Sequence, residues 1–333
     1  MSEFSRRSVL GMGSAMALAA GVARAADIAP ASDTIAPAAD TIALWPGKAP
    51  GDIGTVITRR IEERSHDPSW HDRWIFGVAR PELVVFRPAR PNGSAALVIP
   101  GGSYVFVAYD NEGAEQARWL NALGVTVFVL FYRLPSEGWA RREDVPLQDA
   151  QRAMRIIRRD AQRFGVDPTK IAVLGFSAGG HLAGSLATRH AEQVYRPVDA
   201  ADKLSARPDV AGLVYPVATL AGPATHGGSR DALLGADAPQ QVRELRSVER
   251  RVDATTPPLF LVHASDDGLV PVANSINLYQ ALLDQHRPGE MHIFDEGGHG
   301  FGTRLPAATP GSEWPRLFAR YAARKGVFAA PSA

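Results

Sequence analysis

The chain of 333 residues contains no cysteine. It therefore forms no disulfide, offers no thiolate nucleophile and holds no cysteine-ligated metal. The chain also has no large excess of positive or negative charge, because 36 Lys and Arg residues nearly balance 35 Asp and Glu residues, for a net charge of +1. No basic field is present to recruit nucleic acid or an anionic membrane. No H-E-x-x-H pair occurs among the nine histidines, so a metal site has little support.

The first 25 residues have the three-part pattern of a secretory leader. Arg6 and Arg7 precede a small, apolar stretch over residues 9–22, and the triplet A-R-A follows. The stretch is too short for a stable membrane span, and paired arginines are typical of the bacterial Tat route. We therefore expect residues 1–25 to be a Tat-type signal peptide. The mature protein should then be periplasmic or secreted, with no membrane contact after cleavage.

The remaining residues divide into a linker and one large domain. Residues 26–45 are rich in Ala, Pro and Asp without a clear period, which is typical of a flexible linker. The composition of the chain, with 45% hydrophobic and 21% charged residues, is that of an ordinary globular protein. We expect a single catalytic domain over residues 46–330.

Within this domain, short apolar runs alternate with helical patterns. Strands are predicted over residues 55–65, 82–89, 95–100, 125–132, 170–176, 210–217, 258–264 and 290–296, and helices over 111–123, 145–165, 178–191, 271–286 and 313–326. The alternation predicts an α/β fold with a mainly parallel central sheet and helices on both faces. Residues 218–250 interrupt the rhythm and are expected to form an excursion over the sheet.

Two of the predicted helices carry groups of charge. The helix over 111–123 has Glu112 and Glu115 in its first turn, where the helix dipole favours acids. Four of the five arginines in the helix over 145–165 lie largely outside its apolar stripe, and interspersed aspartates favour a solvated face over a polyanion site; they are Arg152, Arg155, Arg159 and Arg163.

Reactive side chains follow three of the predicted strands. Ser177 lies in G-F-S-A-G, between a strand and a helix. Asp266 and Asp267 follow the next-to-last strand, and His299 follows the last strand within G-G-H-G-F-G. Ligands of a parallel sheet bind beyond the carboxyl ends of its strands. The order Ser, Asp, His is that of an α/β-hydrolase triad, and it leaves open which aspartate serves.

G-x-S-x-G alone also fits an ordinary tight turn, but together with the acid and the histidine it predicts a nucleophile. A serine hydroxyl attacks only when a base takes its proton, and it must stand clear of the sheet to meet a carbonyl carbon. A sharp strand-to-helix turn presents it in this way, with Gly175 and Gly179 relieving the crowding. Ala178 then begins the helix, so its N–H is free for a developing oxyanion.

The second part of an oxyanion hole is expected in the loop after the strand over 95–100. This loop reads P-G-G-S-Y and ends at Tyr104. Its small residues let the backbone approach a substrate oxygen, which predicts the N–H groups of Gly102 and Ser103 as donors. An ordinary turn is the alternative reading.

Three further side chains are weaker candidates. Tyr104 crowds the same loop and is a candidate for the substrate pocket. His226, in the excursion, either contacts substrate or faces solvent. His181 lies one helical turn after Ser177, and we expect it to pack against or orient the turn rather than to react.

With these residues in view, the chain resembles the bacterial α/β-hydrolases of the acetylxylan esterase and feruloyl-esterase-like carbohydrate esterase family. The resemblance covers about residues 41–325. It rests on the segments IPGGSYVFVAYDNEGAEQARWL, LQDAQRAMRIIR, VDPTKIAVLGFSAGGHLA, HGGSRDALLG, LVHASDDGLVPVANS and HIFDEGGHGFG. The family loop is commonly P-G-G-G-Y, so Ser103 is a departure that keeps the backbone N–H and narrows the space for the acyl group.

The resemblance implies a triad and an oxyanion hole at particular positions. The family's nucleophile falls on Ser177, its base on His299 and, through the spacing D-x-x-V-P, its acid on Asp267 rather than Asp266. Its oxyanion donors fall on the residues already singled out, namely Gly102, Ser103 and Ala178.

The activity implied is that of a serine carboxylesterase that needs no cofactor. Its substrate would be a small acyl ester or an acylated saccharide, with acetyl esters of plant polysaccharides such as xylan foremost. Two alternatives stay open: a serine peptidase of similar fold, and a non-catalytic carbohydrate-binding relative.

Overall fold

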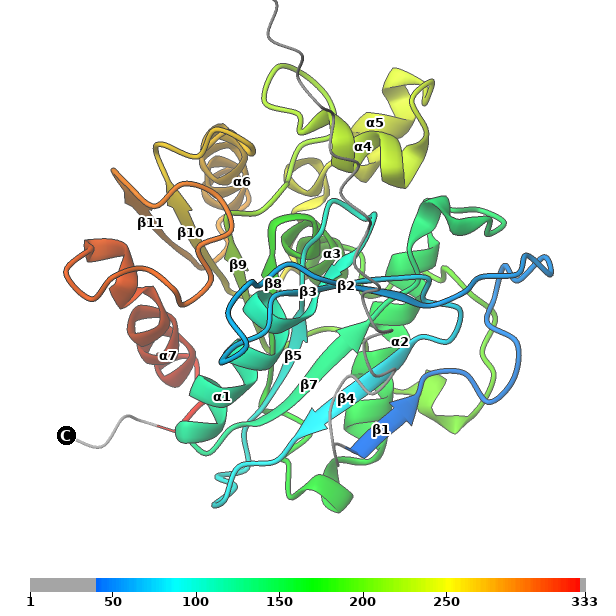
Figure 1. Ribbon diagram of the computed structural model, residues 1–333, viewed down its shortest axis with the longest axis horizontal. Helices are drawn as coiled ribbons and strands as arrows, with labels where there is room; N and C mark the ends of the chain where they lie inside the picture. Colours follow the sequence, from blue (N-terminus) through cyan, green and yellow to red (C-terminus); the bar gives the residue numbers. More distant parts are fainter. Residues whose placement is uncertain (1–39, 330–333) are drawn as a thin grey trace, which may run out of the picture. The chain divides into compact units, whose positions relative to one another are not determined.

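The predicted apolar runs line up as neighbouring strands of one eight-stranded sheet (Figure 1). The computed structural model describes residues 40–329. The strands are, in spatial order, β1 (Asp40–Ala43), β4 (Glu82–Phe86), β7 (Thr126–Phe131), β5 (Ala95–Ile99), β8 (Ile171–Phe176), β9 (Val210–Val214), β10 (Leu259–Ala264) and β11 (Gly289–Phe294). β4 pairs antiparallel with β1 and β7, and all other neighbours pair in parallel. The predicted α/β class with a mainly parallel sheet is confirmed.

Helices cover both faces of this sheet. Within the described residues the α-helices are α1 (Glu115–Ala122), α2 (Val145–Arg159), α3 (Ser177–Thr188), α4 (Gly227–Leu234), α5 (Gln240–Arg246), α6 (Ala273–Asp284) and α7 (Trp314–Arg324). Trp119 of α1 meets Trp314 of α7 with ring centroids 5.9 Å apart, on one face of the sheet. On the other face α2 packs against α3, and both α3 and α6 pack against the turn Val248–Arg251.

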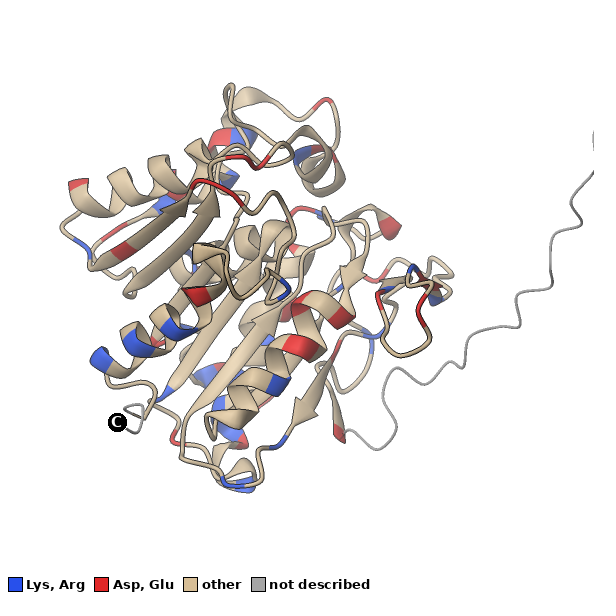
Figure 2. Cartoon of the chain, turned by 60° about the vertical axis from the view of Figure 1, so that its left-hand side comes forward, with Lys and Arg blue, Asp and Glu red and all other residues tan. Residues whose placement is uncertain are grey.

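The inner strands of the sheet form the core. Every residue of β5, β7, β8, β9 and β10 is buried, and none of these strands contains Lys, Arg, Asp or Glu. Figure 2 shows the consequence, with charges of both signs on the surrounding helices and loops and none on the inner strands. Continuous apolar strands are what a parallel sheet covered on both faces requires.

A second, smaller sheet lies beside the loop that follows β5. Its strands are β2 (Arg60–Glu63), β3 (Arg73–Phe76) and β6 (Val107–Ala108), all antiparallel. β2 lies within the predicted strand over 55–65, whereas β3 and β6 are too short to stand out in the sequence. Trp74 stacks on Phe106 with ring centroids 3.8 Å apart, which attaches this sheet to the predicted oxyanion loop.

The predicted signal peptide and most of the predicted linker lie outside the described residues. The end of the linker differs from the prediction, because residues 40–43 form β1 on the edge of the sheet. Leu44 and Trp45 are buried, and the indole N–H of Trp45 donates to Asp149 Oδ1 at 2.8 Å. Residues 40–45, at the end of the segment rich in Ala, Pro and Asp, therefore belong to the folded domain.

The arginine-rich helix also differs from the prediction. α2 ends at Arg159, and the residues after Asp160 form a separate 3-10 turn, Ala161–Phe164. Arg152 is buried rather than solvated: its guanidinium bonds Asp199 at 2.5 Å and Asp202 at 3.1 Å. Its Nε donates to the Leu44 carbonyl at 2.8 Å, so it also holds the chain after β1.

The excursion over 218–250 contains α4 and α5, which the sequence pattern did not reveal as helices. Asn274 of α6 donates to the Ala224 carbonyl at 2.8 Å, and its Oδ1 accepts from the N–H groups of Ala218 and Thr219. The start of the excursion is therefore tied to the helix that follows β10.

Candidate active site

Ser177 lies at the tip of a sharp turn between β8 and α3. Its φ of +51° is a left-handed conformation that non-glycine residues rarely adopt. The turn fits only because glycines stand around it: a Cβ on Gly179 would lie 2.2 Å from the Ile99 carbonyl oxygen, and one on Gly175 would lie 2.3 Å from that of Gly179. The predicted strand-to-helix turn is thus present, with the glycines where crowding requires them.

His299 and Asp267 complete a chain of hydrogen bonds from Ser177. His299 Nε2 lies 2.9 Å from Ser177 Oγ, and His299 Nδ1 lies 2.7 Å from Asp267 Oδ2. Because a carboxylate only accepts, Nδ1 carries the proton, which leaves Nε2 to accept the serine hydroxyl proton. The geometry is that of a nucleophile, a base and an orienting acid.

Asp267 is buried and heavily hydrogen-bonded. Its Oδ1 accepts from the N–H groups of Leu269 and Val270 at 2.9 and 2.8 Å. Burial favours the neutral acid, but hydrogen bonds from His263 and His299 outweigh it and hold the pKa of Asp267 well below its ordinary value. The carboxylate is therefore ionised whenever His299 is to act as a base.

Asp266 has a different role in the structure. Its Oδ1 accepts from the N–H of Gly298 at 2.7 Å, next to His299. An aspartate at such a position commonly accepts from backbone N–H groups of its own turn. Here the donor belongs to the histidine loop instead. Asp266 therefore fixes the loop, and Asp267 meets the imidazole.

His263 is a further member of the site that the sequence did not reveal. It is fully buried in β10, and its Nε2 lies 3.2 Å from Asp267 Oδ2 and 2.9 Å from the Val270 carbonyl. Since both neighbours are acceptors, Nε2 carries the proton and Nδ1 accepts from Ser275 at 2.8 Å. A histidine in an apolar strand gives no signal of this contact except its spacing of four from Asp267.

The predicted oxyanion loop lies against the serine turn. Gly101 has no room for a side chain, because a Cβ there would lie 2.8 Å from Ser177 Cβ. Within residues 40–329, neither the N–H of Gly102 nor that of Ser103 has a hydrogen-bond partner. Ala178 is the second residue of α3, where a backbone N–H has no acceptor within the helix. Unpaired N–H groups are what an oxyanion hole offers before substrate binds.

The side chain of Tyr104 points into the protein, and its assignment to the substrate pocket stays a prediction. Tyr104 is buried with its hydroxyl 2.7 Å from His181 Nδ1. His181 Nε2 lies 2.8 Å from the Arg246 carbonyl, and burial lowers the pKa of His181 to about 4. The pair joins the oxyanion loop to α3 and to the end of α5, so His181 packs beneath the turn as expected.

His226 is half-buried at the start of α4, where its Nδ1 accepts from the N–H of Ser229 at 3.2 Å. Burial lowers the pKa of His226, and the nearby charge of His299 acts in the same direction. The excursion therefore brings His226 toward the triad, and both readings of its role remain predictions.

Within residues 40–329, no group of three His, Asp or Glu side chains is arranged to hold a metal ion. No helix among the described residues is long and apolar enough to cross a membrane.

A serine turn after β8, an acid after β10 and a histidine after β11, on a mainly parallel sheet, define an α/β-hydrolase. Residues 85–282 match the BD-FAE family, and the chain belongs to this family.

The chain is similar to several carbohydrate-active proteins. It is 31% identical to an acetylxylan esterase of Xylanibacter ruminicola over 67% of this chain and 44% of that protein. It is 37% identical to endo-1,4-beta-xylanase B of Butyrivibrio fibrisolvens over 61% of this chain and 32% of that protein. The chain thus spans less than half the length of these two curated relatives.

Among solved structures, the acetyl ester-xyloside bifunctional hydrolase from Caldicellulosiruptor lactoaceticus is similar over nearly its whole length. The match covers 89% of this chain and 99% of that one, with 32% identity and a TM-score of 0.71. Esterase 2 of Thermogutta terrifontis, with 21% identity and a TM-score of 0.62, shares the fold.

Proposed function

We propose that this protein is a serine carboxylesterase that hydrolyses short acyl esters, with acetyl esters of xylan-type saccharides as its substrates. The observation that carries the proposal is the hydrogen-bonded chain Ser177–His299–Asp267, with distances of 2.9 and 2.7 Å, set beside unpaired backbone N–H groups. The names of the relatives, an acetylxylan esterase and an acetyl ester-xyloside hydrolase, support an acylated saccharide as the substrate class.

The reaction follows from the geometry in two halves. His299 Nε2 takes the proton of Ser177 Oγ as the oxygen attacks the ester carbonyl, and Asp267 stabilises the imidazolium that forms. The N–H groups of Gly102, Ser103 and Ala178 receive the negative charge on the carbonyl oxygen. His299 then gives its proton to the sugar oxygen as the ester C–O bond breaks, so that the sugar leaves with a free hydroxyl. In the second half, water attacks the acyl-enzyme with His299 as base and releases the acid.

A substrate panel tests this proposal. The wild-type protein is assayed on p-nitrophenyl acetate, p-nitrophenyl dodecanoate, acetylated xylan and methyl ferulate. Acetyl esters should be cleaved fastest, because the side chain of Ser103 narrows the acyl space. Ser177→Ala should abolish turnover and keep the wild-type melting temperature, and Ser185→Ala, a buried serine of the same helix, should keep both. Faster cleavage of the dodecanoyl ester contradicts the acyl preference, and turnover by Ser177→Ala contradicts the nucleophile.

We also propose that residues 1–25 direct export through the Tat route. The twin arginines, the short apolar stretch and the A-R-A triplet support this proposal.

A further inference from the structure

Glu112 is a buried carboxylate beside the active site that the reaction above does not use. It lies in a π-helical turn, Asp110–Ala114, that leads into α1. Only 4% of the residue is exposed, and no Lys or Arg among residues 40–329 forms an ion pair with it. A buried acid without a cationic partner is costly unless its oxygens are well hydrogen-bonded.

Both oxygens of Glu112 are bonded to loops of the active site. Oε2 accepts from the N–H of Gly101 at 2.7 Å, and Gly101 immediately precedes the predicted oxyanion donors. Oε1 accepts from the hydroxyl of Tyr215 at 2.9 Å, from the segment that follows β9. Burial raises the pKa of Glu112, while the N–H of Gly101, the charge of His299 and the Tyr215 hydroxyl favour its ionised form.

Tyr215 carries the connection to the histidine loop. Its hydroxyl accepts from the N–H of Gly302 at 3.0 Å while donating to Glu112. Its ring lies against that of His299, with centroids 4.9 Å apart, and against that of Phe301 at 4.6 Å. Tyr215 is fully buried with a φ of +36°, a strained conformation for a bulky residue. The strained backbone at Tyr215 thus places this hydroxyl between Glu112 and Gly302.

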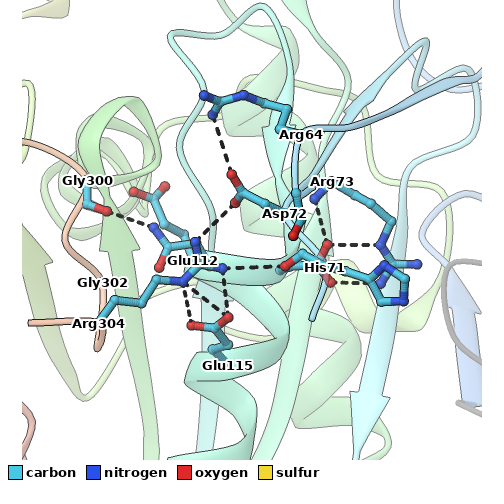
Figure 3. Close-up of polar contacts among 12 residues, drawn as sticks. Arg64, His71, Asp72, Arg73, Glu112, Glu115, Gly300, Gly302 and Arg304 are labelled. Carbon is cyan, nitrogen blue, oxygen red and sulfur yellow. Dashed lines mark hydrogen bonds and ion pairs between the residues drawn. The ribbon is translucent and has the colours of Figure 1, made fainter. Parts of the chain in front are cut away.

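The turn that holds Glu112 is itself fixed to the histidine loop by a second set of contacts. Asn111 donates to the Gly300 carbonyl at 2.7 Å. Arg304 bonds Glu115 at 2.7 Å and Asp72 at 3.2 Å. Figure 3 shows Glu112 and Glu115 beside Gly300, Gly302 and Arg304, so the turn and the histidine loop lie side by side. These contacts therefore fix the position of Glu112 relative to both loops that it joins.

From these contacts we infer that Glu112 is a positioning residue, which acts through Tyr215 to set the distance between the oxyanion loop and His299. This inference rests on the proposed function of the same site. The bridge Gly101–Glu112–Tyr215–Gly302 connects the two loops independently of the Ser177–His299 hydrogen bond. It therefore holds the oxyanion donors and the base in place when that bond breaks as the serine attacks.

Glu112→Gln and Tyr215→Phe test the bridge. Gly101 and Tyr215 donate to different oxygens of Glu112, and glutamine replaces one of these oxygens with an NH2 group that cannot accept. A phenylalanine keeps the ring against His299 and removes only the hydroxyl. Because small misplacements of catalytic groups reduce the rate strongly, each variant should lower kcat on p-nitrophenyl acetate about 10- to 100-fold with KM within about twofold. The double variant should lose no more kcat than the less active of the two single variants, because the two residues form one bridge.

Tyr195→Phe is the matched control. The Tyr195 hydroxyl donates to a carboxylate oxygen of Asp202 at 2.6 Å and accepts from Arg155, and neither partner belongs to the site, so this variant loses a comparable bond. It should lower the melting temperature and keep kcat. Wild-type kcat in Glu112→Gln or Tyr215→Phe, an equal kcat loss in Tyr195→Phe, or losses that multiply in the double variant would each overturn the inference. If Glu112→Gln does not fold, Tyr215→Phe decides.

Labelling of Ser177 by a fluorophosphonate separates this inference from the proposed function, because it needs the activated serine but no ester substrate. The labelling rate should fall in Glu112→Gln and Tyr215→Phe by a factor similar to that for kcat, and stay at the wild-type value in Tyr195→Phe. A wild type that labels but cleaves no ester refutes the proposed function, and the labelling rates still decide the role of Glu112. A wild type that does not label refutes both.

Discussion

At the residue scale, the backbone of the proposed nucleophile, Ser177, is strained, with a φ of +51°. A left-handed non-glycine residue costs about 1–3 kcal/mol and persists only where its surroundings enforce it. The N–H of Val217 donates to the Ser177 carbonyl at 3.0 Å, and the oxyanion loop closes the other side through Gly101. The turn is thus held by neighbours from β5 and β9 as well as by its own glycines.

The two adjacent aspartates should respond differently to the same substitution. Asp267→Asn removes the charge that stabilises the His299 imidazolium and should reduce kcat by about four orders of magnitude. Asp266→Asn weakens only the bond to the N–H of Gly298 and should lower the melting temperature by a few degrees with kcat within about threefold. Turnover of p-nitrophenyl acetate and thermal melting are measured for both variants. An inactive Asp266→Asn beside a normal Asp267→Asn contradicts the assignment of the acid.

His181 makes the stability of the fold depend on pH. Burial lowers the pKa of His181 to about 4, against an ordinary value of 6.5. Between these two pH values the unfolded chain therefore binds a proton at His181 that the folded protein does not bind. The free energy of unfolding should therefore fall as the pH drops from 6.5 to 4, with His181 contributing roughly 3 kcal/mol of the fall.

The variant His181→Gln isolates this contribution, because an amide supplies an NH2 donor group and a carbonyl acceptor without titrating. Urea unfolding is measured between pH 4 and 7 for the wild type, for His181→Gln and for His66→Gln, which is at an exposed position. The fall should be smaller in His181→Gln and unchanged in His66→Gln. Parallel curves for the wild type and His181→Gln would show that His181 is not the titrating group.

Some residues of the site are predictable from the sequence and others are not. Ser177 and His299 stand out because glycines surround each of them at the end of a predicted strand. The choice of Asp267 over Asp266 needs the spacing typical of the family, since both follow the same strand. Glu112 and Tyr215 give no signal, because they are 103 positions apart and each fits its local pattern without the other. Only the fold brings them together.

At the scale of elements, the inner strands are predictable and the edges are not. β5, β7, β8, β9 and β10 are continuous apolar runs, which is the pattern of strands buried on both faces. β1, β3 and β6 have two to four residues, too few to show a period. α2 was predicted longer than it is because Ala161 and Phe164 continue its apolar stripe, although they belong to the following 3-10 turn.

The edge formed by β1 should contribute measurably to stability through Trp45. The indole ring packs edge-on against Tyr195 with centroids 4.9 Å apart, and its N–H bonds Asp149. Trp45→Ala should lower the free energy of unfolding by about 3–5 kcal/mol. Trp70→Ala, at a position that is 43% exposed, should lower it by less than about 1 kcal/mol. Equal effects in urea unfolding would mean that residues 40–45 behave as the linker that their composition suggests.

At the scale of the whole molecule, the two proposals on location and activity fit one another. The absence of cysteine suits a protein exported to an oxidising compartment, because no thiol is available for wrong pairing. The proposed polysaccharide substrate is too large to enter a cell intact, so it fits the proposed export.

Export should depend on the twin arginines. Changing Arg6 and Arg7 together to lysine should retain the protein in the cytoplasm, because the Tat route reads the arginine pair. Periplasmic and cytoplasmic fractions are compared by immunoblot, with Arg24→Lys as the control that leaves the pair intact. N-terminal sequencing of the exported protein should begin at Ala26. Unchanged periplasmic yield of the double variant contradicts the Tat route.

The most direct test of the central claim, an ester hydrolase with Ser177 as its nucleophile, is detection of the acyl-enzyme. The wild-type protein is mixed with p-nitrophenyl acetate, quenched in acid within the first turnovers, digested and analysed by mass spectrometry. The account predicts an acetyl group on the peptide that contains Ser177, at the hydroxyl of that residue, and no such group in Ser177→Ala. Steady turnover with no acetyl group on Ser177, or with the acetyl group on another residue, would contradict it.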